Sequence, residues 1–213
     1  MESEQKASIF EQTYQDYLRH LRQLDLLKIA ERIGVQIDGD SILVPLFGQL
    51  YKICSTGIMD SSGREPSHSV KVVLCQYLLH VPAKGPEEKD WVSYKDFKDA
   101  SPFVRGFQNN TEKAIAKNFA GRLEALRRAC LQLGGKDPGL DWGYQLSIKF
   151  DLLPQVPVLF LFNDTDEEFS AQCLLLFERQ AEKYLDMESM AILAELLTDY
   201  LSQSEGDMRT TVM

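Results

Sequence analysis

Four carboxylates gather directly after an apolar run that ends at Phe162: Asp164, Asp166, Glu167 and Glu168. Carboxylate oxygens are the ligands that hard cations prefer, and crowded carboxylates raise one another's pKa towards use as a general acid. The alternative is an acidic loop leading into a helix N-terminus, where Thr165 and Glu168 would form a capping box. The segment lacks the oxygen count and fixed glycine of a calcium loop, so the sequence indicates no definite metal site.

An aromatic segment supplies the second group of candidate residues. Its rings alternate with basic side chains: Trp91, Tyr94, Lys95, Phe97, Lys98, Phe103, Arg105 and Phe107. Stacking on the rings and pairing with a guanidinium would hold a planar or apolar ligand that carries an acidic group. The alternative is ordinary packing of a loop and a short helix over a sheet.

The remaining side chains of catalytic type are scattered. Of the three histidines, His80 is the most suggestive, because it ends an expected helix beside a proline-containing loop. There it either complements the helix dipole or serves as a ligand or acid-base group. The four cysteines form no CxxC pair and stand in apolar runs, which favours core packing. Since nucleophile, phosphate-loop and zinc-helix motifs are also missing, the sequence identifies no cofactor.

Hydrophobic spacing predicts the elements that must position these residues. Strands are expected at 42–47 and 50–53 around a tight turn, with Pro45 at an edge or bulge, and at 144–150 and 156–162, the last being more central. Helices are expected at 9–33, stopped by Gly34, at 67–80, capped by Ser67, at 111–133, ended by Gly134 and Gly135, and at 171–185 and 187–201. We expect one α+β domain over 9–202, a small and mostly antiparallel sheet flanked by helices. Residues 1–8 are expected to be disordered and 203–213 to form a flexible tail.

Charge and hydropathy restrict the partners. The chain of 213 residues has 32 acidic and 23 basic side chains and a formal charge of -9, which disfavours nucleic acid and anionic lipid. The N-terminus is polar, and no apolar run approaches the length of about 20 residues that a membrane-spanning helix needs. We therefore expect a cytoplasmic protein that is not bound to a membrane.

Several short motifs resemble an uncharacterised prokaryotic family, domain of unknown function 3786. They extend over about residues 10–202 and lie at 91–100, 118–121, 133–135, 153–154, 157–158, 164–169 and 184–188. The resemblance implies a bacterial or archaeal cytoplasmic protein, often from anaerobes. Some members carry a cysteine-rich iron-sulfur segment of the kind found in corrinoid proteins, which this chain lacks, and the family implies no catalytic residues.

Three functions remain open. The first is a module that binds a small molecule, a cofactor or a partner, with a link to corrinoid or anaerobic metabolism, in a cleft shared by the acidic and aromatic segments. The second is a metal-assisted enzyme that uses Asp164, Asp166 and Glu168. The third is a structural or assembly protein whose closing helix, with Met187, Met190 and Leu193, forms a homodimer face.

Overall fold

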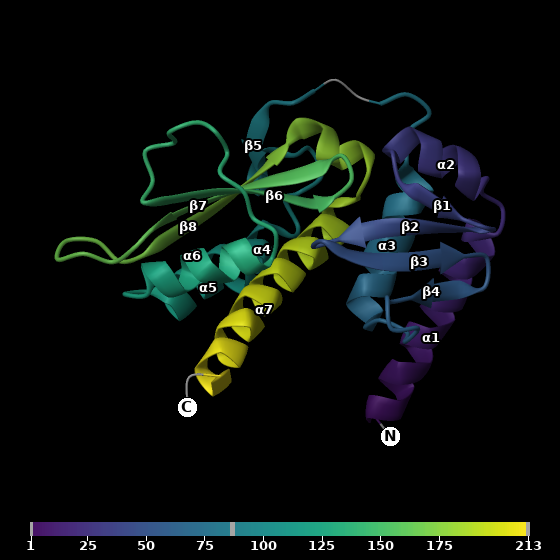
Figure 1. Ribbon diagram of the computed structural model, residues 1–213, viewed down its shortest axis with the longest axis horizontal. Coiled ribbons are helices and arrows are strands. Elements are labelled where there is room, and N and C mark those ends of the chain that lie inside the picture. The colour runs from purple at the N-terminus through teal and green to yellow at the C-terminus, as the bar shows by residue number, and fades with distance from the viewer. Residues whose placement is uncertain (1, 86–87, 212–213) are drawn as a thin grey trace.

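The strands form two separate four-stranded antiparallel sheets in the computed structural model, which describes residues 2–85 and 88–211 (Figure 1). The first sheet has the order β1-β2-β3-β4, with β1 at Gln36–Asp38, β2 at Ser41–Leu46, β3 at Gln49–Cys54 and β4 at Gly57–Met59. The second has the order β5-β8-β7-β6, with β5 at Trp91–Ser93, β6 at Leu146–Leu153, β7 at Val156–Asn163 and β8 at Gln172–Glu178. The α+β class is confirmed, with two sheets where we expected one.

The hairpin of β2 and β3 follows the sequence prediction. Phe47 and Gly48 connect the strands and both have positive φ, 51° and 74°, as a two-residue hairpin turn of the primed type requires. Pro45 pairs with Leu50 of β3, but β1 pairs only with residues 41–43 of β2. Pro45 therefore has no strand on its other side, which is the local edge position expected for proline.

The first predicted helix is two helices. Helix α1 spans Glu2–Leu21, and α2 spans Leu26–Ile33. Asp25 separates them because its side chain accepts a hydrogen bond from the backbone N–H of Lys28 and so caps α2. The predicted stop is confirmed, since Gly34 ends α2 in the left-handed conformation with φ 72°. Helix α1 begins within the segment 1–8 for which we expected disorder, and Met1 lies outside the described residues.

The prediction for the central helix α3, His68–His80, is confirmed. The Ser67 hydroxyl accepts a hydrogen bond from the Val70 N–H at 3.4 Å and caps the helix. Helix α3 packs against α1 on one side and against α7, Met187–Thr211, on another (Figure 1). Helix α7 continues into the predicted tail 203–213, of which residues 212–213 lie outside the described part of the chain.

The helix predicted at 111–133 is also divided. It consists of α5, Glu112–Phe119, and α6, Leu123–Gln132, and a separate helix α4, Val104–Asn110, precedes it. Between α5 and α6, Gly121 has φ 72°, and its N–H donates to the Asp164 carboxylate at 2.6 Å. The same carboxylate accepts from the Leu123 N–H at 3.2 Å. Asp164 thus acts as an N-cap supplied from a distant turn.

We expect Asp164→Ala to lower the free energy of unfolding by about 1–2 kcal/mol, the usual effect of removing an N-cap acceptor. The loss arises because the N–H groups of Gly121 and Leu123 lose their acceptor. Urea unfolding of wild type and variant measures the difference. Glu167→Ala, at an exposed position in the same turn, is the matched control and should change stability by less than about 0.5 kcal/mol.

The second sheet contains one element that the sequence analysis misassigned. Residues 171–185 were predicted as a helix, but β8 occupies Gln172–Glu178 of this segment and pairs with β7 on one side and β5 on the other. The short 3-10 helix η2, Arg179–Lys183, follows β8, and η1, Tyr94–Asp96, follows β5. Strand β7 lies inside the sheet with residues 156–162 buried, so its more central position is confirmed.

Buried apolar side chains from both sheets and from the helices form one continuous cluster. Met187, Met190 and Leu193 of α7 belong to it, being 7%, 0% and 0% exposed. These residues cannot supply the dimer face that we predicted, because they already pack inside the fold. Among the described residues, no helix combines the length and the apolar character that crossing a membrane would require.

Candidate functional site

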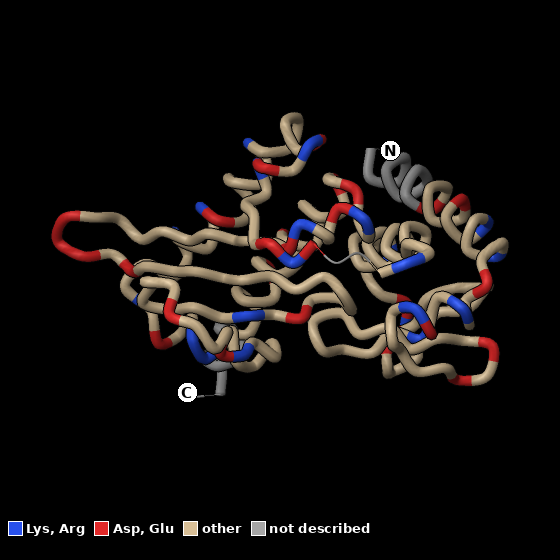
Figure 2. The backbone as a smooth tube through the Cα atoms, turned by 90° about the horizontal axis from the view of Figure 1, so that it is seen from above, with Lys and Arg blue, Asp and Glu red and all other residues tan. Residues whose placement is uncertain are grey.

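The acidic and aromatic segments lie at opposite ends of β8. The acidic turn connects β7 to β8 beside the pair Asn163 and Gln172, whereas Trp91 pairs with Glu178 at the other end of the strand. With about 3.3 Å per residue, the length of β8 separates the two segments by about 20 Å. Figure 2 shows the acidic turn as a red run at one extremity of the molecule. The prediction of a cleft shared by the two segments is therefore wrong.

The carboxylates of the acidic turn mainly organise the backbone. Asp166 Oδ1 accepts from the N–H groups of Glu168 and Phe169 at 2.8 and 2.7 Å, and these bonds lower the pKa of Asp166. Thr165 donates its hydroxyl to the Phe169 carbonyl, so the predicted capping box with Glu168 is not formed. The physical reason is that a strand, and not a helix, follows the turn. Glu167 and Glu168 are exposed.

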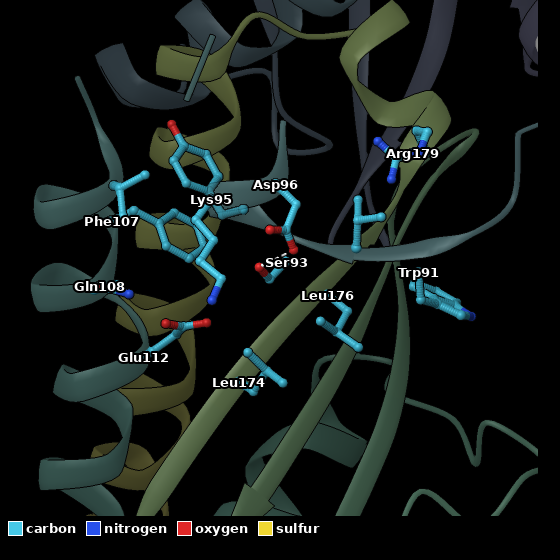
Figure 3. Close-up of a pocket in the computed structure, with 13 residues that line it drawn as sticks. Trp91, Ser93, Lys95, Asp96, Phe107, Gln108, Glu112, Leu174, Leu176 and Arg179 are labelled. Carbon is cyan, nitrogen blue, oxygen red and sulfur yellow. Dashed lines mark hydrogen bonds between the residues drawn. The ribbon is translucent and has the colours of Figure 1, made fainter. Parts of the chain in front are cut away.

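A pocket of about 420 Å³ opens where β5 ends and the chain turns into η1. We call it the β5 pocket (Figure 3). Its walls come from β5 and η1, from α4 and α5, and from β8, and include Trp91, Ser93, Tyr94, Lys95, Asp96, Phe107, Gln108, Glu112, Leu174, Leu176 and Arg179. The Tyr94 and Phe107 rings stack with centroids 4.0 Å apart, and the Tyr94 hydroxyl donates to the Met187 carbonyl. One wall of the pocket is therefore rigidly held.

The β5 pocket contains two cations and two carboxylates. Asp96 accepts the Ser93 hydroxyl at 2.7 Å, and Glu112 accepts the Leu175 N–H at 3.1 Å. Burial raises the pKa of Glu112, against smaller lowering effects of the Leu175 bond and of Lys95. Within the part of the chain that the structure describes, neither Lys95 nor Arg179 forms an ion pair. The pocket thus presents two basic side chains that are not paired with any carboxylate of the described residues.

We expect Glu112→Gln to become progressively more stabilising, relative to wild type, as the pH rises through and above 4.5. Burial holds the pKa of Glu112 in the folded protein above its ordinary value of 4.5, so the unfolded chain releases this proton first. The free energy of unfolding of the wild type therefore decreases as the pH rises from the pKa of Glu112 in the unfolded chain to its pKa in the folded protein. Glutamine does not titrate, so the variant lacks this decrease. Urea unfolding from below pH 4.5 to about pH 7 measures the difference. The exposed Glu167→Gln is the control, and an equal trend in both variants would contradict the argument.

Other predicted site residues lie outside the β5 pocket. Phe97 is 3% exposed and packs against Phe177, at a centroid distance of 6.4 Å, so it belongs to the core. Arg105 is exposed on α4 and does not line the pocket. Trp91 and Tyr94 are the predicted site residues that the structure places in it, together with Lys95 and Phe107 of the same aromatic segment.

His80 lies at a different cavity of about 550 Å³, between the end of α3 and the start of α7. Its Nδ1 is 2.8 Å from the Gln76 carbonyl, an interaction in which Nδ1 carries the proton, at the C-terminus of α3. This contact fits the dipole role better than a ligand role. Across residues 2–85 and 88–211, no three His, Cys, Asp or Glu side chains are grouped as a metal site would need.

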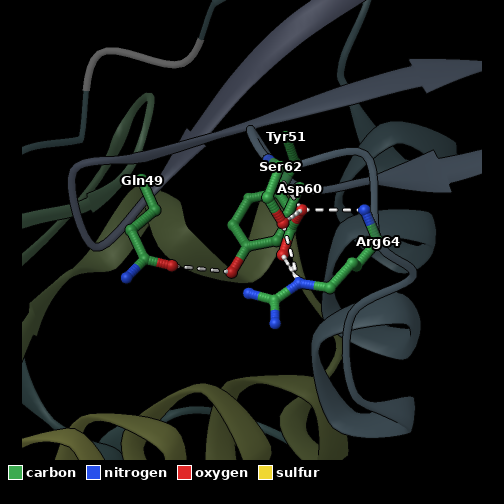
Figure 4. Close-up of polar contacts among 5 residues, drawn as sticks. All are labelled: Gln49, Tyr51, Asp60, Ser62 and Arg64. Carbon is green, nitrogen blue, oxygen red and sulfur yellow. Dashed lines mark hydrogen bonds and ion pairs between the residues drawn. The ribbon is translucent and has the colours of Figure 1, made fainter.

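A third polar cluster follows β4 (Figure 4). Asp60 Oδ1 accepts from the Ser62 N–H, the Ser62 hydroxyl and the Arg64 N–H, and Arg64 Nε donates to the Ser62 hydroxyl. Nearby, the Tyr51 hydroxyl donates to Gln49 at 3.2 Å, and burial strongly raises the pKa of Tyr51. The Asp60 carboxylate, which accepts the Ser62 hydroxyl at 2.6 Å, is thus occupied in closing a turn through the N–H groups of Ser62 and Arg64.

Sequence reasoning missed several residues of the β5 pocket, among them the charged Glu112 and Arg179. Glu112 was overlooked because it lies at the start of a predicted amphipathic helix. A carboxylate in the first turn of a helix is common and carries no functional signal. Arg179 was hidden because β8 and η2 were predicted as one helix. No local pattern in the sequence brings these two residues to the same strand edge.

Fold and site together define a two-sheet α+β protein with a pocket of mixed charge at the edge of its second sheet. The chain belongs to the family described as a domain of unknown function (DUF3786), whose model matches residues 25–200. The predicted resemblance is thereby confirmed. No curated protein and no solved structure matches the chain significantly.

Proposed function

We propose that this protein is a small-molecule-binding module and that its site is the β5 pocket. The observation that carries the proposal is the Arg179 guanidinium, which lines a pocket with aromatic and leucine walls and has no ion-pair partner among the described residues. A guanidinium is the group best suited to hold a carboxylate or phosphate through two parallel hydrogen bonds. The ligand therefore carries an acidic group that Arg179 binds.

The pocket volume favours a small ligand. About 420 Å³ lies near the lower end of the range of about 300–1,000 Å³ for small-molecule sites. It suits a compact metabolite better than a corrinoid macrocycle, so the link to corrinoid metabolism stays a prediction of the family resemblance. The prokaryotic origin and the cytoplasmic location implied by that resemblance are part of the same proposal.

A thermal-shift screen of small carboxylates and phosphate esters, followed by calorimetry on the compounds that bind, tests the proposal. We expect Arg179→Ala to raise the Kd of such a ligand at least about 10-fold, because a charged hydrogen bond contributes about 1.5–3 kcal/mol. Arg105→Ala, which removes an exposed guanidinium from α4, is the matched control and should leave the Kd unchanged.

Two outcomes would refute the proposal. One is a screen in which no acidic compound shifts the melting temperature of the wild-type protein. The other is a ligand whose Kd is the same in wild type, Arg179→Ala and Arg105→Ala, because such a ligand binds elsewhere.

A further inference from the structure

The two ends of the β5 pocket differ in charge and hydrogen bonding. At one end, Glu112 uses Oε1 to accept the Leu175 N–H, and its Oε2 has no hydrogen-bond partner among the described residues. Figure 3 shows this carboxylate and Lys95 at one side of the pocket and Arg179 at the other. One end thus offers a hydrogen-bond acceptor on a carboxylate, and the other offers the guanidinium.

Strand β8 fixes the distance between these two ends. Glu112 contacts the strand at Leu175, and Arg179 follows four residues later, directly after the strand ends. Four extended residues span about 13 Å. Because both side chains reach inwards, the gap that a ligand must bridge is shorter than this. A free amino acid, whose charged groups are attached to one carbon, is too short to reach both ends.

The charged side chains of the pocket select against ligands whose charged groups all have the same sign. Lys95 and Arg179 are balanced by Asp96 and Glu112, and Asp96 is already bound to the Ser93 hydroxyl. Lys95 lies at the Glu112 end, but no hydrogen bond or ion pair joins these two side chains among the described residues, so a ligand with acidic groups at both ends would still place one of them against Glu112. A ligand with only basic groups would leave the Arg179 guanidinium without an acidic partner. A ligand with one group of each sign, held apart, satisfies both ends.

We propose that the β5 pocket takes an elongated amphoteric ligand of the length of a two- to four-residue peptide, with its acidic group on Arg179 and its ammonium group on Glu112. At about 3.3–3.6 Å per extended residue, three residues bridge most of the gap. The apolar walls formed by Leu174 and Leu176 then face the middle of the ligand. This inference rests on the proposed function and names the class of ligand.

Tri-alanine and its two blocked forms provide the test. The Kd of tri-alanine, N-acetyl-tri-alanine and tri-alanine amide is measured by calorimetry on the wild type, Glu112→Gln, Arg179→Ala and the control Arg105→Ala. In the wild type we expect acetylation and amidation each to raise the Kd at least about 10-fold. The effect of acetylation should vanish in Glu112→Gln, and that of amidation should vanish in Arg179→Ala.

The comparison of blocked and free peptides on the wild-type protein does not depend on whether a variant folds. Equal Kd values for free and blocked tri-alanine in the wild type would overturn the inference. So would a protein that does not bind tri-alanine but binds a compound from the acid screen through Arg179, a result that leaves the proposed function intact. If nothing binds at Arg179 in either experiment, both proposals fail.

Discussion

Replacing Phe177 with alanine should lower the free energy of unfolding by about 3–5 kcal/mol, the usual cost of deleting a buried phenylalanine ring. Phe177 is 0% exposed, and its ring lies 6.4 Å from Phe97 and 6.2 Å from Phe107, measured between centroids. Deletion leaves a cavity behind the aromatic wall of the β5 pocket. Since domains are stable by only about 5–15 kcal/mol, this one change should remove a large share of the total.

Phe169→Ala is the matched control for this prediction. It makes the same chemical change in the turn before β8, where the side chain is 63% exposed. Urea unfolding should show a change of less than about 0.5 kcal/mol for this variant. Comparable losses in the two variants would contradict the assignment of Phe177 to the buried face of β8. A shift of the strand register by one residue would move every side chain of β8 to the opposite face of the sheet.

The misassignment of β8 shows where sequence patterns stop being informative. Its residues 173–177 are Cys-Leu-Leu-Leu-Phe, with no polar residue to mark a period of two, and leucine favours a helix. The segment becomes a strand because β7 and β5 provide hydrogen-bond partners on both sides. The pairing with β5, which comes from far earlier in the chain, overrides local propensity and leaves no local sign.

The divided helices reveal a different limit. The apolar residues of 111–133 have helical spacing on both sides of Gly121, so this spacing alone predicts one continuous helix. The division depends on the Asp164 carboxylate, which arrives from a turn 41 residues beyond Leu123. The division between α1 and α2 was more accessible, because Asp25 is a capping residue in the local sequence.

The hairpin, the cap at Ser67 and the stops at Gly34 and Gly134 were all predictable, since each depends on residues within a few positions. The candidate site was predictable only in part. Trp91, Tyr94 and Lys95 lie in one segment and were grouped correctly, whereas Glu112 and Arg179 reach the β5 pocket only through the pairing of β8. A site assembled at the edge of a sheet requires the strand order, and a single sequence does not supply that order.

Gly135→Ala should destabilise the protein by about 3 kcal/mol, at the upper end of the usual cost of overpacking. Gly134 and Gly135 end α6 by donating their N–H groups to the carbonyls of Leu131 and Cys130, the two bonds of a Schellman motif. A Cβ atom on Gly135 would lie 2.7 Å from the Cys130 carbonyl oxygen and 2.6 Å from Ile148 Cγ2. The carbonyl oxygen belongs to the backbone of the helix, so the helix end must move away from β6.

Thermal unfolding checks this prediction, because about 3 kcal/mol corresponds to a decrease in Tm of about 6–12 °C for a chain of this size. Gly106→Ala is the control within a helix. No atom lies within 4 Å of its added Cβ, and alanine favours a helix interior over glycine by about 0.5–1 kcal/mol. The two identical substitutions should therefore shift Tm in opposite directions. A Gly135→Ala protein as stable as the wild type would mean that α6 does not approach β6 as closely as the structure has it.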